Sequence, residues 1–357
     1  MPTPASHMAR LAPAVHGGRA ALPDEQAAVL DFSVCLNAYG PSSVVREAMT
    51  TCAVDEYPDP TARAARRAAA GCWRCDADWL MMGAGSAELL HAICRAYLAP
   101  ERRAVVLRPC FGEYERAAIL AGASVHGVHD VAAMVECLAY DVHVAFVATP
   151  DSPCGRSMPR DALERLANAC VAHDVLLVVD QAYDAFTPTP LGTPILPDRA
   201  HVVHLRSMTK EHALAGVRVA FAHGHPEVLA QIEAARVPWA SSQLAQAAAK
   251  ALFTPEARDH ARETVQRLRA ESLQLELALR RQGIAVSSSD THYRLIGCRS
   301  AADARAVLLR HERMLVRDCS SFGLPRHIRV AARRPHENAR LLRAIAAQAT
   351  HFQTGHD

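Results

Sequence analysis

A regular alternation of strand-like and helix-like segments is the feature of this sequence that most constrains its fold. In chain order, the segments are 103–107 (strand), 113–121 (helix), 142–148 (strand), 160–172 (helix), and 175–179, 201–205 and 217–222 (strands). Parallel strands need long crossover connections, usually helices, and the resulting sheet is covered on both faces. The sequence therefore predicts an α/β fold with a mostly parallel sheet between layers of helices.

The pattern also divides the chain into units. Residues 226–283 are helical and charged, whereas the alternation after 284 is weaker, with short strand-like runs and two helix-like segments. We expect a large α/β domain over 42–283 and a small α+β domain over 284–357. The irregular N-terminal residues, 1–41, are expected to form an arm that belongs in part to the small domain.

Composition excludes several classes of protein. The net charge is +2, with basic and acidic residues interspersed, so no nucleic-acid or membrane partner is expected. The chain has no apolar run of membrane-spanning length and no secretion signal, and we expect a cytoplasmic protein. Its 11 cysteines are expected to be thiols, most of them buried. Cys72 and Cys75 form the one close pair, and without a second pair no metal site is predicted.

Polar features follow several of the predicted strands. Asp180 ends an apolar run, and the segments 149–155 and 207–210 each come directly after another. Ligands of open parallel sheets bind at the carboxyl ends of the strands. The turn at 83–86, which opens a helix, adds a fourth feature to this edge. We therefore predict a functional site where these segments converge.

The residue types at this edge favour a phosphate at one end of the site. Ala84, Gly85 and Ser86 form a glycine-containing turn at a helix N-terminus, where backbone N–H groups and the helix dipole attract anions. Ser207 and Arg218 could complete a phosphate-binding cup.

The other end of the site favours a reactive carbonyl compound. Lys210 follows a strand and is a candidate amine nucleophile that forms a Schiff base. A buried carboxylate needs a partner, and a protonated ring nitrogen would suit Asp180. Phosphate cup, carboxylate and lysine together describe a site for pyridoxal 5'-phosphate, whose ring stabilises a carbanion at the substrate α-carbon.

Nine short segments carry a family resemblance. They are 16–18 (HGG), 31–33 (DFS), 57–58 (YP), 111–114 (FGEY), 180–183 (DQAY), 206–210 (RSMTK), 238–239 (PW), 317–319 (RDC) and 328–331 (IRVA). In this order and spacing the chain resembles fold-type I pyridoxal-phosphate enzymes of the aminotransferase class I/II group over nearly its whole length. It is most similar to threonine-phosphate decarboxylases of cobalamin biosynthesis, and next to histidinol-phosphate aminotransferases.

The resemblance implies a role for each cofactor contact. Lys210 corresponds to the lysine that binds the cofactor and later transfers protons, Asp180 to the partner of the ring nitrogen, and Tyr183 to the donor to the phenolic oxygen. Tyr57 corresponds to a tyrosine that reaches the phosphate of the neighbouring subunit, which implies a homodimer with shared active sites. The remaining implied cofactor contacts are Phe111 on the ring face and Ser207, Thr209 and Arg218 on the phosphate.

On the substrate side the resemblance implies a small amino-acid substrate. Arg329 corresponds to the arginine that binds the substrate carboxylate, and Arg317 and His16 to groups near its distal end. Cys35, which stands where the decarboxylase has an asparagine, and Asn37 are further candidates for substrate contact.

One cofactor position departs from the family. The relatives carry Asn-Pro-Thr-Gly where this chain has Ser152-Pro153-Cys154-Gly155. Ser152 has one hydroxyl donor in place of an amide NH2. We hypothesise that the phenolic oxygen is less stabilised here, so that the bound cofactor titrates at higher pH than in the relatives.

The resemblance implies an external aldimine with an amino acid, followed by a quinonoid at its α-carbon, and leaves the reaction open. An α-decarboxylase similar to the threonine-phosphate enzyme is the first interpretation and an aminotransferase the second. A specialised-metabolite enzyme for elimination, replacement or carbon–carbon bond formation is the third. Regulators with this fold carry an added DNA-binding domain, for which residues 1–40 are too short and irregular.

Overall fold

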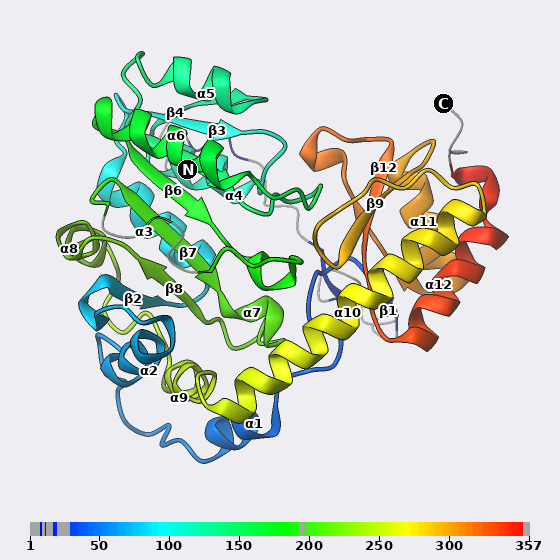
Figure 1. The fold of residues 1–357 in the computed structure, drawn as a ribbon, viewed down its shortest axis with the longest axis horizontal. Helices are drawn as coiled ribbons and strands as arrows, with labels where there is room; N and C mark the ends of the chain where they lie inside the picture. The colour runs from blue at the N-terminus through cyan, green and yellow to red at the C-terminus, as the bar shows by residue number, and fades with distance from the viewer. Residues whose placement is uncertain are drawn as a thin grey trace, which may run out of the picture.

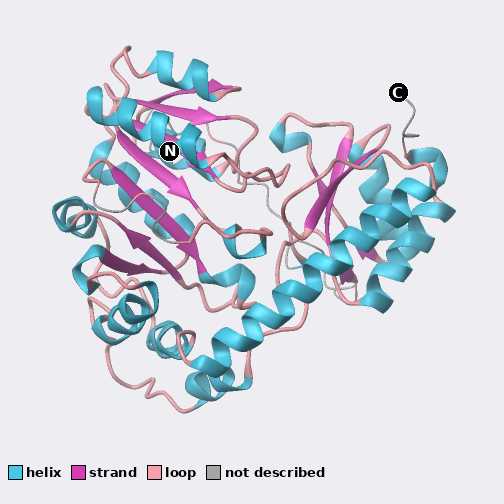
Figure 2. Ribbon diagram, in the orientation of Figure 1, coloured by secondary structure: helices cyan, strands magenta, loops and turns pink. Residues whose placement is uncertain are grey.

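A seven-stranded mixed sheet forms the centre of the large part of the molecule (Figures 1 and 2). The computed structural model describes residues 8, 11, 17–19, 29–192, 196 and 199–352. Across the sheet the strands follow the order β2-β8-β7-β6-β5-β3-β4, and only β8 runs antiparallel to its neighbours. The strands are β2 (Leu80–Gly83), β3 (Arg103–Leu107), β4 (Ser124–Val128), β5 (Val144–Ala148), β6 (Leu176–Asp180), β7 (Val202–Ser207) and β8 (Ala220–His223).

Helices cover both faces of this sheet, as the prediction of an α/β fold requires. One face carries α3, α4 and α8, and the other carries α5 and α6 over β5 and β6 and α1, α2 and α9 over β2 and β8. The helices are α1 (Ser43–Thr50), α2 (Arg63–Trp73), α3 (Ser86–Tyr97), α4 (Glu113–Leu120), α5 (Val131–Cys137), α6 (Arg160–Ala172), α8 (Pro226–Ala234) and α9 (Gln243–Ala251).

Strict alternation along β6 decides which side chains meet each layer. Leu177 and Val179 pack under α6, whereas Leu176 and Val178 join the core beneath α3 and α4. Since successive side chains point to opposite faces, Asp180 lies on the α3–α4 side. This periodicity aims the carboxylate at the end of β6 toward α4.

The remaining sheets form a smaller layered unit (Figure 1). In the three-stranded sheet β11 and β9 both pair antiparallel with β12, and α11 and α12 share a core with it. Phe32, from the start of the chain, is buried in the same core. Its elements are β9 (Tyr293–Gly297), β11 (Arg317–Asp318), β12 (His327–Ala331), α11 (Ala301–Glu312), α12 (Pro335–Ala347) and the parallel pair β1 (Leu30–Asp31) and β10 (Met314–Leu315).

The long helix α10 (Pro255–Arg281) connects the two units. Near its N-terminus Ala257 packs in the core around α9, whereas Leu275 and Leu279 pack in the core of the small unit. Its 27 residues span roughly 40 Å. Figure 1 shows α10 (yellow) running from the large sheet to the small one.

Sequence analysis missed three short elements in the large unit. They are β2, β4 and α5. Strand β4 is a partly exposed edge strand that contains polar residues and a glycine, and α5 has seven residues, so neither has a clear periodic signal. The strand predicted over 201–205 is longer than expected, because β7 continues to Ser207, and a short helix, α7 (Met208–Glu211), carries Lys210. In the described part of the chain, no helix combines the length and apolar character needed to cross a membrane.

Candidate active site

Strand register brings the predicted phosphate-binding segments together. Gly83 at the end of β2 and Ser207 at the end of β7 both pair with Ala220, the first residue of the antiparallel strand β8. The residues just before Ala220 therefore lie beside those just after Gly83. Arg218, Ser86 and Ser207 line one cavity as a result.

The glycine-containing turn fits closely against Arg218. Gly85 has φ +88°, and a Cβ there would lie 2.5 Å from Nη2 of Arg218, so only glycine allows this approach. Ser86 is the first residue of α3, a 12-residue helix. The hydroxyls of Ser207 and Thr209 lie 2.7 Å apart in the same cavity. This end of the cavity presents hydroxyls, a helix N-terminus and a guanidinium.

Asp180, the last residue of β6, is buried and lines the same cavity. Its Oδ2 accepts a hydrogen bond from the hydroxyl of Tyr114 at 2.7 Å, and its Oδ1 accepts one from the N–H of Ala182 at 2.9 Å. Burial raises the pKa of Asp180, and the two hydrogen bonds and the positive charge of Lys210 oppose this rise. The carboxylate is thus held in a place where a cationic partner would stabilise it.

Sequence reasoning missed Tyr114 as a site residue. It follows Phe111 by three residues in the FGEY segment: Phe111 lies just before α4, Tyr114 lies in its first turn, and the N–H of Tyr114 donates to the Phe111 carbonyl at 3.1 Å. Their rings meet edge to face with centroids 5.8 Å apart, and both line the cavity. Its place in the FGEY segment beside Phe111 was therefore the signal that could have found Tyr114.

Lys210 projects into the cavity from α7. Burial lowers the pKa of its amine, and the positive charges of Arg329 and Arg218 lower it further, whereas Cys35 and Asp180 oppose this. Its Nζ lies 5.9 Å from the ring centroid of Tyr183. A lysine with a lowered pKa carries more of the neutral, nucleophilic form near neutral pH.

The substrate side of the site is a larger adjoining cavity of about 600 Å³. Phe111, Lys210 and Tyr183 line both cavities, and Cys35 lines the larger one. Arg329 is buried there, and its Nη1 donates to the hydroxyl of Ser152 at 2.7 Å.

Arg317 also lines this cavity. Its Nη2 donates to the Ser321 hydroxyl at 2.8 Å, and its guanidinium lies over the ring of Phe322. Two guanidinium groups therefore face the space in which a substrate would bind.

Two predicted contacts are placed elsewhere. The N–H of Ala84 donates to the carboxylate of Glu88 at 3.2 Å, so it is not free for a phosphate, and Ala87 lines the cavity instead. The side-chain amide of Asn37 donates to the Glu211 carbonyl and the Thr264 hydroxyl, and it lines neither cavity. Asn37 therefore fixes the backbone after Lys210, and the prediction of substrate contact is not met by its position.

One other predicted contact, Tyr57, lies apart from both cavities within one chain. Tyr57 is 80% exposed and stacks on Trp239 with ring centroids 4.7 Å apart. His16 falls outside the described residues. Among the described residues, the structure thus gathers the predicted cofactor and substrate contacts around Lys210, apart from Ala84, Gly85, Asn37 and Tyr57, which line neither cavity.

Fold and site together define the class. A mostly parallel sheet with a lysine, a buried aspartate and an anion-binding turn at one edge is the arrangement of fold-type I pyridoxal-phosphate enzymes. Residues 28–345 match the family described as aminotransferase class I and II, and the chain belongs to that family.

Known relatives support this assignment. Histidinol-phosphate aminotransferase of Symbiobacterium thermophilum is 35% identical over 327 residues, which cover 87% of this chain and 88% of the relative. Threonine-phosphate decarboxylase of Salmonella typhimurium is 31% identical over 89% of this chain and 90% of the relative. A histidinol-phosphate aminotransferase from Sinorhizobium meliloti in complex with pyridoxal-5'-phosphate has the same fold, with a TM-score of 0.87, 22% identity and coverage of 96% and 97%.

These similarities confirm the class and reorder the predicted reactions. The protein is a pyridoxal 5'-phosphate-dependent enzyme that acts on a small, amino-acid-like substrate. Most of the relatives compared are histidinol-phosphate aminotransferases. They favour the aminotransferase interpretation over the decarboxylase interpretation that the sequence motifs placed first.

The residues present fit the cofactor chemically. Lys210 supplies an amine for the aldehyde, and buried Asp180 supplies a counter-charge for a protonated ring nitrogen. Phe111 offers a flat apolar wall. Ser86, Ser207, Thr209 and Arg218 would hold the phosphate at the other end.

Proposed function

We propose that the protein is an aminotransferase that moves an amino group between an amino-acid-like donor and a keto acceptor. The observation that carries the proposal is the 2.7 Å bond between Arg329 and Ser152. It fixes an anion-binding guanidinium at the side of the cavity that Ser152 shares with Lys210.

The position of Arg329 supports loss of a proton from the substrate. When bound, the cofactor supplies an electron sink for the bond that stands perpendicular to its ring. Ser152 follows β5, and Asp180 ends the neighbouring strand β6. A substrate carboxylate bound by Arg329 would therefore lie beside Ser152. With the carboxylate held by Arg329, the α-hydrogen would be the group that Lys210 removes.

Lys210 would carry the proton in this reaction. Its lowered pKa lets Nζ accept the proton from the α-carbon and return it at a neighbouring atom. Asp180 would pair with the protonated ring nitrogen of the bound cofactor, and Tyr114 keeps the Asp180 carboxylate oriented. Phe111 and Tyr183 line the cavity together with Lys210.

We also propose that two chains form a homodimer whose active sites share residues. Four large apolar side chains of two separate segments are strongly exposed in one chain: Val54, Tyr57, Val237 and Trp239. Exposed apolar groups of this kind mark interaction surfaces. Changing Trp239 to Asp should yield monomers with weakened cofactor binding, and an unchanged dimer in analytical ultracentrifugation would contradict the proposal.

Two substrates distinguish the aminotransferase from the second candidate, a decarboxylase, which the Salmonella relative supports. Purified holoenzyme is incubated with histidinol phosphate plus 2-oxoglutarate, or with threonine O-phosphate. Our proposal predicts formation of glutamate in the first mixture and no release of CO2 in the second. Stoichiometric CO2 without amino transfer would establish the decarboxylase instead.

A further inference from the structure

We infer that Tyr293 is a positioning residue that holds Ser152 against Arg329 and so sets the geometry of anion recognition. The inference rests on the proposed role of Arg329 in binding the substrate. Tyr293 lies in β9 of the small unit, whereas Ser152 follows β5 of the large sheet. It therefore joins two parts of the site that come from different units.

Tyr293 contacts Arg329 directly and Ser152 through the preceding residue, Asp151. Its hydroxyl donates to the carbonyl of Asp151, the residue before Ser152, at 2.6 Å. Its ring lies below the guanidinium of Arg329, with Cζ 5.2 Å from the ring centroid. The side chain is fully buried, and burial raises the pKa of the phenol, which keeps the hydroxyl protonated as a donor.

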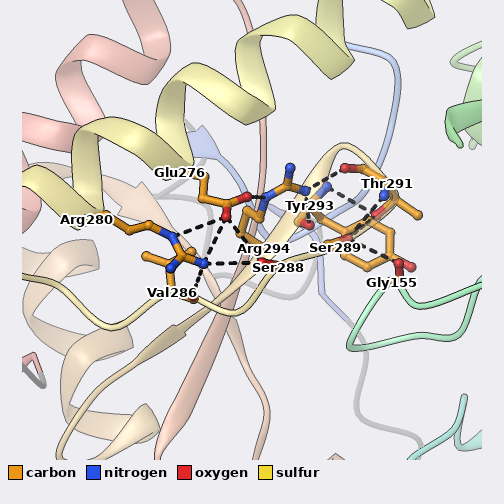
Figure 3. Close-up of polar contacts among 9 residues, drawn as sticks. All are labelled: Gly155, Glu276, Arg280, Val286, Ser288, Ser289, Thr291, Tyr293 and Arg294. Carbon is orange, nitrogen blue, oxygen red and sulfur yellow. Dashed lines mark hydrogen bonds and ion pairs between the residues drawn. The ribbon is translucent and has the colours of Figure 1, made fainter. Parts of the chain in front are cut away.

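The loop before Tyr293 reinforces the same contact. The N–H of Asp290 donates to the carbonyl of Gly155 at 2.8 Å, and the Asp290 carboxylate accepts from the N–H of Ser157 at 2.9 Å. Ser289 donates to the Gly155 carbonyl at 3.4 Å (Figure 3). Gly155 has φ +76°, and a Cβ there would collide with the hydroxyls of Ser289 and Thr291. The 151–157 loop is thus fastened along its length.

A buried ion pair anchors this loop to α10 (Figure 3). Nε of Arg294 donates to Glu276 at 2.7 Å, and Nη1 of Arg294 donates to the carbonyls of Thr291 and Tyr293 at 2.6 and 3.0 Å. Arg280 binds the other oxygen of Glu276. Because α10 packs in the cores of both units, Tyr293 is fixed relative to the large sheet as well.

The consequence for Ser152 is specific. The hydroxyl of Ser152 has a single proton to donate, and its oxygen already accepts a hydrogen bond from Arg329. Changing Tyr293 to Phe keeps the ring and removes the bond to Asp151, so the loop that carries Ser152 loosens. Substrate affinity should fall about 5- to 10-fold, the size of one lost buried hydrogen bond.

A double-mutant cycle in the holoenzyme tests whether Tyr293 acts through Ser152. The variants are Tyr293→Phe, Ser152→Ala and both together, with Tyr140→Phe, at an exposed tyrosine, as the control. The readouts are half-saturation by L-glutamate and the pH midpoint of the cofactor's visible absorbance. Tyr293→Phe should weaken glutamate binding and raise the midpoint when Ser152 is present. When Ser152 is absent, it should change binding less than twofold and the midpoint by less than about 0.3 pH unit. Equal factors in the two backgrounds would overturn the inference.

Hydrogen exchange of the 149–157 segment gives a test that needs no substrate. Tyr293→Phe should speed exchange there, and Gly155→Ala, which disturbs the same contact from the other side, should do likewise. Unchanged exchange in both variants would also overturn the inference. If the wild-type enzyme does not react with L-glutamate, the proposed function fails, whereas the midpoint and exchange measurements still decide the role of Tyr293.

Discussion

The hydroxyl of Tyr114 lies 2.7 Å from Oδ2 of Asp180, and both groups are buried. A hydrogen bond to a carboxylate favours its ionised form, which is the form that would pair with a protonated ring nitrogen. The bond exists because alternation along β6 turns Asp180 toward the helix layer from which Tyr114 projects.

Replacing Tyr114 with Phe should therefore weaken cofactor binding. The change leaves the Asp180 carboxylate with a higher pKa and fewer hydrogen bonds, and a charged hydrogen bond contributes about 1.5–3 kcal/mol. We expect the affinity of the apoenzyme for pyridoxal 5'-phosphate to fall at least tenfold in an absorbance titration. Tyr140→Phe, at an exposed position, serves as the control. Equal or tighter binding by the variant would show that the bond does not support Asp180.

Replacing Ser152 with Asn should shift the titration of the bound cofactor. The serine has a single hydroxyl proton, and its oxygen already accepts from Arg329, whereas an asparagine amide has two N–H groups. An added donor stabilises the ionised phenolic oxygen, and we expect the pH midpoint of the visible absorbance to fall by about 1 unit. The same midpoint in both proteins would end the hypothesis drawn from the sequence.

Arg329→Lys should damage substrate binding and leave the cofactor in place. A lysine keeps the charge but cannot form the paired hydrogen bonds of a guanidinium, and a buried charged contact contributes about 2–5 kcal/mol to binding. We expect KM for the amino donor to rise about 100-fold, while the visible absorbance of the holoenzyme is retained. Steady-state kinetics measures the first and a spectrum the second. Wild-type KM in the variant would remove Arg329 from substrate recognition.

Two buried histidines should make the apoenzyme sensitive to acid. Burial lowers the pKa of His292, which stacks on Phe186, and of His204 to about 3, and nearby positive charge lowers them further. The unfolded chain binds these protons below about 6.5 and the folded chain does not, so stability is present above 6.5 and is lost as pH falls toward 3.

Urea unfolding of the apoenzyme at pH 7 and pH 5 tests this expectation. Each histidine should remove about 1.4 kcal/mol of unfolding free energy for each pH unit below 6.5. His292→Asn should therefore lose about 2 kcal/mol less than wild type between the two pH values. The same loss in both proteins would show that His292 is protonated in the folded state.

Much of the site could be predicted because its residues stand at the ends of strands. The apolar runs before Asp180 and Lys210 fix where the sheet ends, and parallel pairing brings such ends together. Roles that depend on tertiary neighbours could not be found this way. The side-chain amide of Asn37 donates to the hydroxyl of Thr264, 227 residues away in sequence. No local pattern reports such partners.

The same limit explains the fold elements that were missed. Strand β2 has four residues, all buried, and it leads directly into the turn at Gly85, so the helix signal masks it. Its place beside the antiparallel strand β8 follows only from long-range pairing. Tyr293 likewise looks like an ordinary core residue of a strand until its contact with Asp151 is seen.

The most direct test of this account is to identify the lysine that binds the cofactor. The chain contains two lysines, Lys210 in the cavity and Lys250 on the exposed surface of α9, which makes Lys250 an internal control. The protein is loaded with pyridoxal 5'-phosphate, reduced with borohydride, digested and examined by mass spectrometry. The account predicts a phosphopyridoxyl group on the peptide that contains Lys210 and an unmodified Lys250. A group on Lys250, or equal labelling of a Lys210→Ala variant, would contradict it.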